Sequence, residues 1–202
     1  MRIVSAQELE SWLASGRILE KDGRGPKVVA LPDGQLLKIF RPRRRLWLAR
    51  LRPQAQRFAD NASKLRTLGI EAPRIGEQGW IDHSAAVSFC LYQPLPGQSL
   101  DKLFLHERQR FMQLLPALAR FIRELHSKGI YFRSLHLGNI LLLPEGGFGL
   151  IDFLDLRIKR QPLGPALARR NLQHLHGYLQ RSRIEDFPWR DLIELYKLEA
   201  RS

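Results

Sequence analysis

Two short apolar segments joined by a turn, with a polar residue at each outer end, constrain this chain most. Residues 140–143 and 148–151 bracket a Pro- and Gly-containing turn, residues 144–147, which predicts a β-hairpin. Asn139 stands directly before the first segment and Asp152 directly after the second. The open end of an antiparallel hairpin places such residues side by side. Two oxygen ligands that converge in this way suit Mg²⁺ bound to phosphate groups.

The residues before this hairpin resemble the catalytic loop of protein kinases. That loop reads His-Arg-Asp, then four residues, then a metal-binding Asn, and a later Asp-Phe-Gly supplies a second metal ligand. Arg133 and Asn139 match the loop, and Asp152-Phe153 matches the later motif. Ser134 stands where the catalytic Asp would be. Taken alone, Asn139 could cap a turn and Asp152 could end a strand, but the combined spacing favours a kinase-like site.

The N-terminal half predicts a small antiparallel sheet with helices beside it. The expected strands are the apolar segments 28–31, 36–40 and 87–92. Asp33-Gly34 between the first two predicts a tight hairpin. The expected helices run from the capping box of Ser5 and Glu8 to Gly16, and from Pro53 in its first turn to Leu68.

The C-terminal half predicts mainly helices. An apolar stripe marks one of them: Leu114, Leu118, Phe121, Ile122 and Leu125. Pro116 either kinks this helix or opens its main part. A later helix is marked by Leu172, Leu175 and Leu179. His174 and His176 fall on different faces of it, which predicts two surface residues rather than a metal pair.

Between these halves, Pro and Gly interrupt the pattern and predict a hinge. We therefore expect a single domain of 202 residues, with an N-lobe at about residues 1–92, a hinge at about 93–97 and a C-lobe at about 98–202.

Lys38 lies inside one of the apolar segments, so its charged head needs an anionic partner. In protein kinases a strand lysine so placed holds the phosphates of ATP. The plainer interpretation is an edge lysine that points to solvent. Residues 21–27, which include Gly23 and Gly25, could form a loop that covers phosphate, but Pro26 lacks the amide donor that such a loop uses.

With Lys38, the segment 91–97, and the Asn139 and Asp152 pair in this order, the chain resembles the lipopolysaccharide kinase family (Kdo/WaaP group) from about residue 18 to residue 179. The resemblance implies an α+β, two-lobed protein-kinase-like fold, with a small antiparallel sheet lobe followed by a mainly helical lobe. It implies ATP and Mg²⁺ as cofactors, and a hydroxyl of an inner-core heptose or Kdo sugar as acceptor. It also implies a cytoplasmic location, peripheral at the inner face of the cytoplasmic membrane.

The resemblance assigns roles to individual residues. Nucleotide binding falls to Lys38, Gly23, Gly25, Asn139 and Asp152, metal binding to Asn139 and Asp152, and the catalytic loop to Arg133, Ser134 and His136. Residues 25–29 and 134–139 further resemble a subgroup, the toluene-tolerance-type proteins of pseudomonads.

Two departures from the family pattern bear on activity. A serine hydroxyl at position 134 cannot by itself accept a proton near neutral pH, and a general base is worth about 10² to 10⁴ in rate. His136 and Asp155 are candidates for a substitute base. No Glu occurs between Glu20 and Glu71, so Asn61 takes the helix position from which a glutamate would pair with the strand lysine. An enzyme is favoured, and the alternative is a pseudokinase that binds nucleotide or a partner in a regulatory or scaffolding role.

The charge balance favours anionic partners. Lys and Arg number 33 against 20 Asp and Glu, a formal net charge of +13. A basic cluster with Trp47 interleaved comprises Arg41, Arg43, Arg44, Arg45, Arg50 and Arg52. It is either a solvated face or a surface for anionic lipid or nucleic acid. The chain lacks a helix-turn-helix or aromatic-rich signature, which argues against a nucleic-acid-binding module.

The sequence also bears on the expected location of the protein. The N-terminus has no apolar run typical of a signal peptide, and no stretch approaches the roughly 20 apolar residues that span a bilayer. Cys90 is the single cysteine, so no intramolecular disulfide can form, and a reducing compartment is expected.

Overall fold

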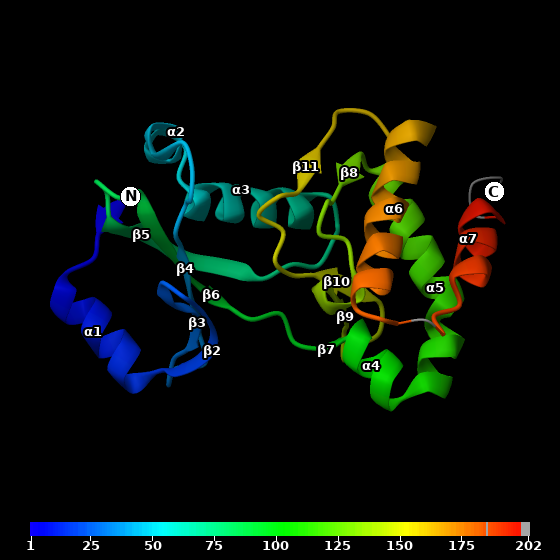
Figure 1. The fold of residues 1–202 in the computed structure, drawn as a ribbon, viewed down its shortest axis with the longest axis horizontal. Helices are drawn as coiled ribbons and strands as arrows, with labels where there is room; N and C mark the ends of the chain where they lie inside the picture. The colour runs from blue at the N-terminus through cyan, green and yellow to red at the C-terminus, as the bar shows by residue number, and fades with distance from the viewer. Residues whose placement is uncertain (185, 199–202) are drawn as a thin grey trace. The chain divides into compact units, whose positions relative to one another are not determined.

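The computed structural model describes residues 1–184 and 186–198. The chain divides into two compact units, Met1–Leu95 and Pro96–Ser202, whose elements are drawn in Figure 1. The division falls inside residues 93–97, the segment predicted to be a hinge; the hinge role itself stays a prediction. Among the described residues, no helix combines the length and the apolar character that crossing a membrane requires.

A six-stranded sheet forms the first unit, in the order β1-β5-β6-β4-β3-β2 (Figure 1). Its strands are β1 Arg2–Ile3, β2 Arg17–Asp22, β3 Gly25–Ala30, β4 Leu36–Phe40, β5 Arg74–Asp82 and β6 Val87–Gln93. Neighbouring strands are antiparallel except β1 and β5, which are parallel. The helices of this unit are α1 Ala6–Ser15, α2 Leu46–Leu51 and α3 Gln54–Thr67.

The predicted N-terminal hairpin is confirmed. Strands β3 and β4 pair with Ala30 opposite Leu36. In the turn, Asp33 Oδ1 accepts a hydrogen bond of 2.9 Å from the N–H of Gln35, and Gly34 has a φ of +83°. Glycine adopts positive φ without strain, so the Asp-Gly pair decides where the chain turns.

Side chains along β4 alternate between the two faces of the sheet. Leu37 joins a buried cluster against which Trp12 of α1 packs. Phe40 faces the other side, where its ring lies 5.5 Å from the ring of Phe58 in α3. Lys38 lies on that side too, because its Nζ is 5.3 Å from the centroid of the Phe58 ring. Helices α1 and α3 therefore cover opposite faces, and strand register fixes Lys38 on the α3 side.

Strands β1, β2 and β5 were not predicted from the sequence, and the structure explains why β2 and β5 lack a strand pattern. The edge strand β2 buries none of its residues, so it carries no apolar alternation. Strand β5 contains two glycines, which weaken a strand pattern; a Cβ at Gly79 would lie 2.4 Å from the Phe89 ring. Residues 21–27, predicted to be a loop before the first strand, instead form the end of the β2–β3 hairpin, with Asp22 opposite Gly25.

Both predicted helices of this unit are confirmed. The N–H of Glu8 donates to Ser5 Oγ at 3.1 Å, and the Glu8 carboxylate bonds back to the Ser5 backbone, which completes the capping box. Gly16 caps the far end of α1. Helix α3 starts one residue later than predicted, because Pro53 is its N-cap rather than part of its first turn.

Helices and short strand pairs form the second unit (Figure 1). Its helices are α4 Leu100–His106, α5 Arg108–Ser127, α6 Pro165–Arg181 and α7 Trp189–Leu198, with the 3-10 helix η1 Leu137–Asn139. Its strands are β7 Gln98–Ser99, β8 Ile130–Tyr131, β9 Ile140–Leu142, β10 Phe148–Leu150 and β11 Arg157–Ile158. Strands β10, β9 and β7 form one sheet, and β11 pairs with β8.

The predicted apolar stripe of α5 is largely confirmed. Leu118, Phe121, Ile122 and Leu125 are buried. Leu114 is only half-buried, and its neighbour Leu115 takes the buried position. The helix runs on through Pro116 rather than starting there.

The two histidines of α6 were predicted to be surface residues, but both are half-buried. Nε2 of His174 lies 2.9 Å from the hydroxyl of Tyr131. The ring of His176 packs at 4.6 Å on that of Trp189. Within the part of the chain that the structure describes, no group of three or more His, Cys, Asp or Glu side chains could hold a metal.

Candidate functional site

The second predicted hairpin is formed by β9 and β10, and it brings Asn139 and Asp152 to the same end. Ile140 pairs with Leu150, and the N–H of Ile151 donates to the carbonyl of Asn139 at 3.0 Å. Asn139 is 7% exposed, whereas Asp152 is exposed. A buried amide and an exposed carboxylate thus stand at one edge of this small sheet.

The amide of Asn139 is oriented by the loop before it. Its Nδ2 donates a hydrogen bond of 3.0 Å to the carbonyl of Ser134. That bond uses the donor end of the amide and leaves Oδ1 as a potential metal ligand. Mg²⁺ is commonly held by one or two protein side chains together with phosphate oxygens. Asn139 and Asp152 therefore fit a metal that arrives with a nucleotide, rather than one held by the protein alone.

Asp152 has a strained backbone. Its φ is +51°, in the left-handed region that costs a non-glycine residue about 1–2 kcal/mol. Such strain persists where the surroundings impose it, and it concentrates at functional sites. Here the next residue supplies the anchor, because the Phe153 side chain is fully buried and its carbonyl accepts from the N–H of Leu156 at 3.2 Å. The turn after Asp152 is thereby held in place.

Ser134 is hydrogen-bonded to a carboxylate from the segment after Asp152. Its Oγ donates to Asp155 Oδ2 at 2.7 Å. The other oxygen of Asp155, Oδ1, is buried and has no hydrogen-bond partner among the described residues. Of the two candidates for a substitute base, Asp155 is therefore the one that the structure brings into contact with Ser134.

His136 lies on the same loop in a different environment. Its ring stacks on that of Tyr178 in α6, with centroids 4.3 Å apart and planes 14° from parallel. Burial lowers the pKa of this imidazole, and the nearby carboxylates of Asp101, Asp152 and Asp155 oppose that shift. The lowered pKa keeps His136 neutral at neutral pH and makes it a weak proton acceptor.

Asn171 of α6 anchors the start of the loop, and the sequence reasoning missed it. Its Nδ2 donates to the carbonyl of Phe132 at 2.5 Å, and its Oδ1 accepts from the N–H of Phe132 at 3.4 Å. The next residue, Arg133, is exposed. The available signal was that Asn171 lies four residues before Leu175, on the buried face of an amphipathic helix. An Asn at such a position is uncommon unless it satisfies buried polar groups.

In the first unit, Lys38 meets an aromatic face on α3 instead of a glutamate. Its ammonium group lies over the Phe58 ring, as described above. Asp60, the acidic residue of that helix, accepts a hydrogen bond of 2.8 Å from Gln56 Nε2. Asn61, predicted to replace the glutamate, is half-buried. The ammonium group is attracted to the face of this ring in a cation–π contact.

Gly23 and Gly25 lie at the tip of the β2–β3 hairpin. Gly25 has a φ of +108°, which only glycine adopts readily. The N–H of Arg24 between them donates to Asp22 Oδ1 at 2.8 Å, so this amide is used within the turn. Arg41 also supports the hairpin, since its Nη1 donates to the carbonyl of Pro26 at 2.6 Å. Arg41 therefore differs from the exposed arginines that follow it.

A profile of the lipopolysaccharide kinase (Kdo/WaaP) family matches residues 34–196. The chain belongs to this family. The match includes Lys38, Ser134, Asn139 and Asp152, and it leaves Gly23 and Gly25 outside.

Among solved structures, the 2.2 Å crystal structure of WbdD is similar, with a TM-score of 0.52 and 15% sequence identity over 86% of this chain. The matched part is 43% of the WbdD chain, so this protein spans less than half of that one. A comparison with curated protein sequences finds no significant match. The family and the structural likeness confirm the predicted fold class, a protein-kinase-like α+β fold with a sheet lobe and a mainly helical lobe.

Proposed function

We propose that this lipopolysaccharide kinase family member is an ATP- and Mg²⁺-dependent phosphotransferase that acts on a hydroxyl of an inner-core heptose or Kdo sugar. The observation that carries the proposal is the placement of Asn139 Oδ1 and Asp152 at one end of the β9–β10 hairpin. Family membership supplies the substrate class. A closer relation to the toluene-tolerance-type proteins of pseudomonads belongs to the same proposal.

In this proposal each residue has a defined task. Asn139 and Asp152 hold Mg²⁺, which when bound neutralises charge on the transferring phosphoryl group. Lys38 orients a nucleotide phosphate, with its ammonium group positioned over the Phe58 ring. Gly23 contributes at the hairpin tip, where a Cβ would meet open space and the backbone can therefore be approached closely.

The alternative is a pseudokinase that binds nucleotide or a partner without useful turnover. Two observations favour it: Ser134 replaces the catalytic Asp, and α3 presents Phe58 to Lys38 where a glutamate would be expected. Neither removes the groups assigned to the nucleotide and the metal. Phosphoryl transfer depends mostly on positioning and charge stabilisation, so we favour the enzyme.

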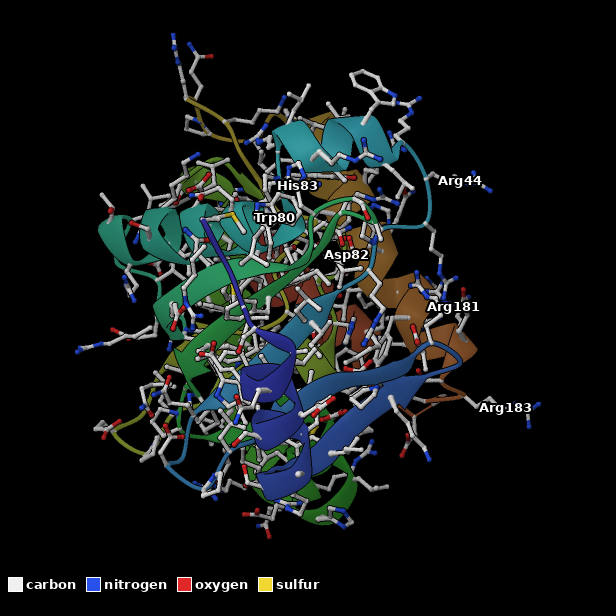
Figure 2. All side chains as sticks on the ribbon, turned by 90° about the vertical axis from the view of Figure 1, so that its left-hand side faces the viewer. Arg44, Trp80, Asp82, His83, Arg181 and Arg183 are labelled. Atoms are coloured by element: carbon white, nitrogen blue, oxygen red, sulfur yellow. The ribbon has the colours of Figure 1, made fainter. Side chains whose placement is uncertain are left out.

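We also propose that α2 docks the protein on anionic lipid at the inner face of the cytoplasmic membrane. Trp47 and Leu51 of this helix are 64% and 76% exposed. The exposed arginines around them are Arg43, Arg44, Arg45, Arg50 and Arg52, and Figure 2 shows Arg44 pointing away from the ribbon. Exposed apolar side chains flanked by arginines are typical of interfacial segments, in which the charges meet lipid phosphates.

Mg²⁺-ATP binding and phosphate transfer test the proposed function separately. At a hundredfold excess over Kd, a ligand that binds only the native state stabilises it by about 2.7 kcal/mol, so Mg²⁺-ATP should raise the melting temperature. Asp152→Ala should abolish the metal-dependent part of that rise. Phosphate transfer from ATP to delipidated core oligosaccharide then separates the enzyme from the pseudokinase. If millimolar Mg²⁺-ATP does not change the melting temperature of the wild-type protein, both the enzyme and the nucleotide-binding pseudokinase are contradicted.

A further inference from the structure

The bond between Ser134 and Asp155 has a chemical consequence at the position where the family's base is missing. Ser134 Oγ donates to Asp155 Oδ2 at 2.7 Å, across 21 residues of sequence. Its carbonyl also receives the Asn139 amide. Ser134 is thus tied on one side to a carboxylate and on the other to the residue that is assigned to the metal.

We propose that Ser134 and Asp155 form a proton relay, in which Ser134 contacts the acceptor hydroxyl and Asp155 receives the proton through it. This inference rests on the proposed function. It assigns the missing base to a carboxylate supplied by a different segment from the catalytic loop.

Access to the two oxygens of Asp155 favours a relay over direct contact with the acceptor. Oδ2 is occupied by the Ser134 hydroxyl. Oδ1 is buried, with no hydrogen-bond partner in residues 1–184 and 186–198. Because the Ser134 hydroxyl donates its single proton to Asp155, the lone pairs of Oγ are left to accept a hydrogen bond from another donor. An acceptor hydroxyl therefore meets an oxygen that is already polarised by a carboxylate.

The step balances in atoms and charge. The acceptor oxygen forms a bond to the γ-phosphorus of ATP, and the bond from that phosphorus to the β–γ bridging oxygen breaks, leaving its electron pair on ADP. The acceptor's proton moves to Ser134 Oγ while the original hydroxyl proton of Ser134 moves to Asp155 Oδ2. Asp155 then returns its proton to solvent, and Ser134 is unchanged at the end of the turnover.

Exchanging the two residues provides the sharpest test. Ser134→Ala and Asp155→Asn should each lower kcat by about 10² or more, the range for a placed base, with the KM for ATP unchanged. The double variant Ser134→Ala/Asp155→Asn should be no slower than the slower single, as expected for residues that act as a unit. Ser134→Asp alone should also be slow, because it sets two carboxylates against each other. The exchange Ser134→Asp/Asp155→Ser should recover to within about tenfold of wild type, since it moves the carboxylate to the loop.

Controls separate this inference from the proposed function. Asp155→Asn preserves shape and a hydrogen-bond acceptor for Ser134, and the Mg²⁺-ATP rise in melting temperature verifies that each variant is folded and binds nucleotide. Asp191→Asn, an equivalent change at an exposed residue of α7, should leave kcat unchanged. An Asp155→Asn protein with wild-type kcat, or a folded exchange variant no faster than the singles, would overturn the relay alone. Wild type that binds Mg²⁺-ATP but transfers nothing would overturn both the relay and the enzyme assignment.

Discussion

Lowering the pH from 7 to 4.5 should destabilise the second unit through one buried histidine, His126. This residue of α5 is 2% exposed. Its Nδ1 lies 2.7 Å from the hydroxyl of Tyr196 in α7, and its Nε2 lies 3.1 Å from Asn171 Oδ1 in α6. His126 therefore joins three helices, and through Asn171 it reaches the loop that carries Ser134.

The hydrogen bonds define which nitrogen of His126 carries the proton. Asn171 donates to Phe132 through Nδ2, so its Oδ1 can only accept, and His126 must donate from Nε2. Nδ1 then accepts from the Tyr196 hydroxyl, whose oxygen in turn accepts from Arg123 Nη1 at 3.2 Å. A second proton on His126 would point at this hydroxyl, and the proton of Tyr196 would lose its acceptor.

The pKa of His126 follows from this environment. Burial lowers it from 6.5 to about 4, the hydrogen bond to Asn171 opposes the shift, and the charge of Arg123 adds to it. Because the folded pKa lies below the unfolded value, the unfolded chain binds a proton first as the pH falls. The stabilisation is complete above pH 6.5 and is lost between pH 6.5 and about 4. At 1.36 kcal/mol for each pKa unit, the loss is about 3 kcal/mol.

Two measurements test this reasoning. NMR titration of the imidazole signals should show one histidine that stays neutral down to about pH 4. Urea unfolding at pH 7 and pH 4.5 should show that wild type loses about 2.5 kcal/mol more between these conditions than His126→Gln does, because part of the full loss falls below pH 4.5. Other titrating groups are common to both proteins and cancel in this comparison. Titration of His126 near pH 6.5, or an equal loss of unfolding free energy in the two proteins, would refute the proposed tautomer and the stability attributed to it.

Two further predictions concern α2 and the loop anchor. Changing Arg43, Arg44 and Arg45 to Gln should weaken binding to phosphatidylglycerol vesicles by about 1 kcal/mol per charge at low salt, measured by co-sedimentation. The matched control changes three exposed arginines of the second unit to Gln: Arg160, Arg169 and Arg183. Equal vesicle binding by both triple variants would show that the arginines around α2 are merely solvated and do not bind lipid. Asn171→Leu leaves the backbone of Phe132 without its partners and should cost about 1–3 kcal/mol for each buried group. Unchanged hydrogen exchange at the Phe132 amide would contradict this anchoring role.

What could be predicted from the sequence was local. The Asp33-Gly34 turn, the capping box at Ser5 and the β9–β10 hairpin each depend on residues close together in the chain, and turn chemistry alone specifies them. Because Asn139 and Asp152 flank the β9–β10 hairpin, their placement at the same end of it follows directly from the hairpin. The family resemblance used such local motifs together with their order along the chain, from Lys38 to Asp152, and it implied the fold class.

What the tertiary structure decided depends on contacts between distant segments. Asp155 approaches Ser134 only because the turn after Asp152 folds back over the loop, and the two residues are 21 positions apart. Asn171 and Phe132 are 39 positions apart. Ser, Asp and Asn are mostly exposed to solvent in folded proteins, so no local sequence pattern identifies Ser134, Asp155 and Asn171 as residues with buried partners. Packing of buried side chains such as Phe153 fixes the path of the chain, and that path determines which polar groups meet.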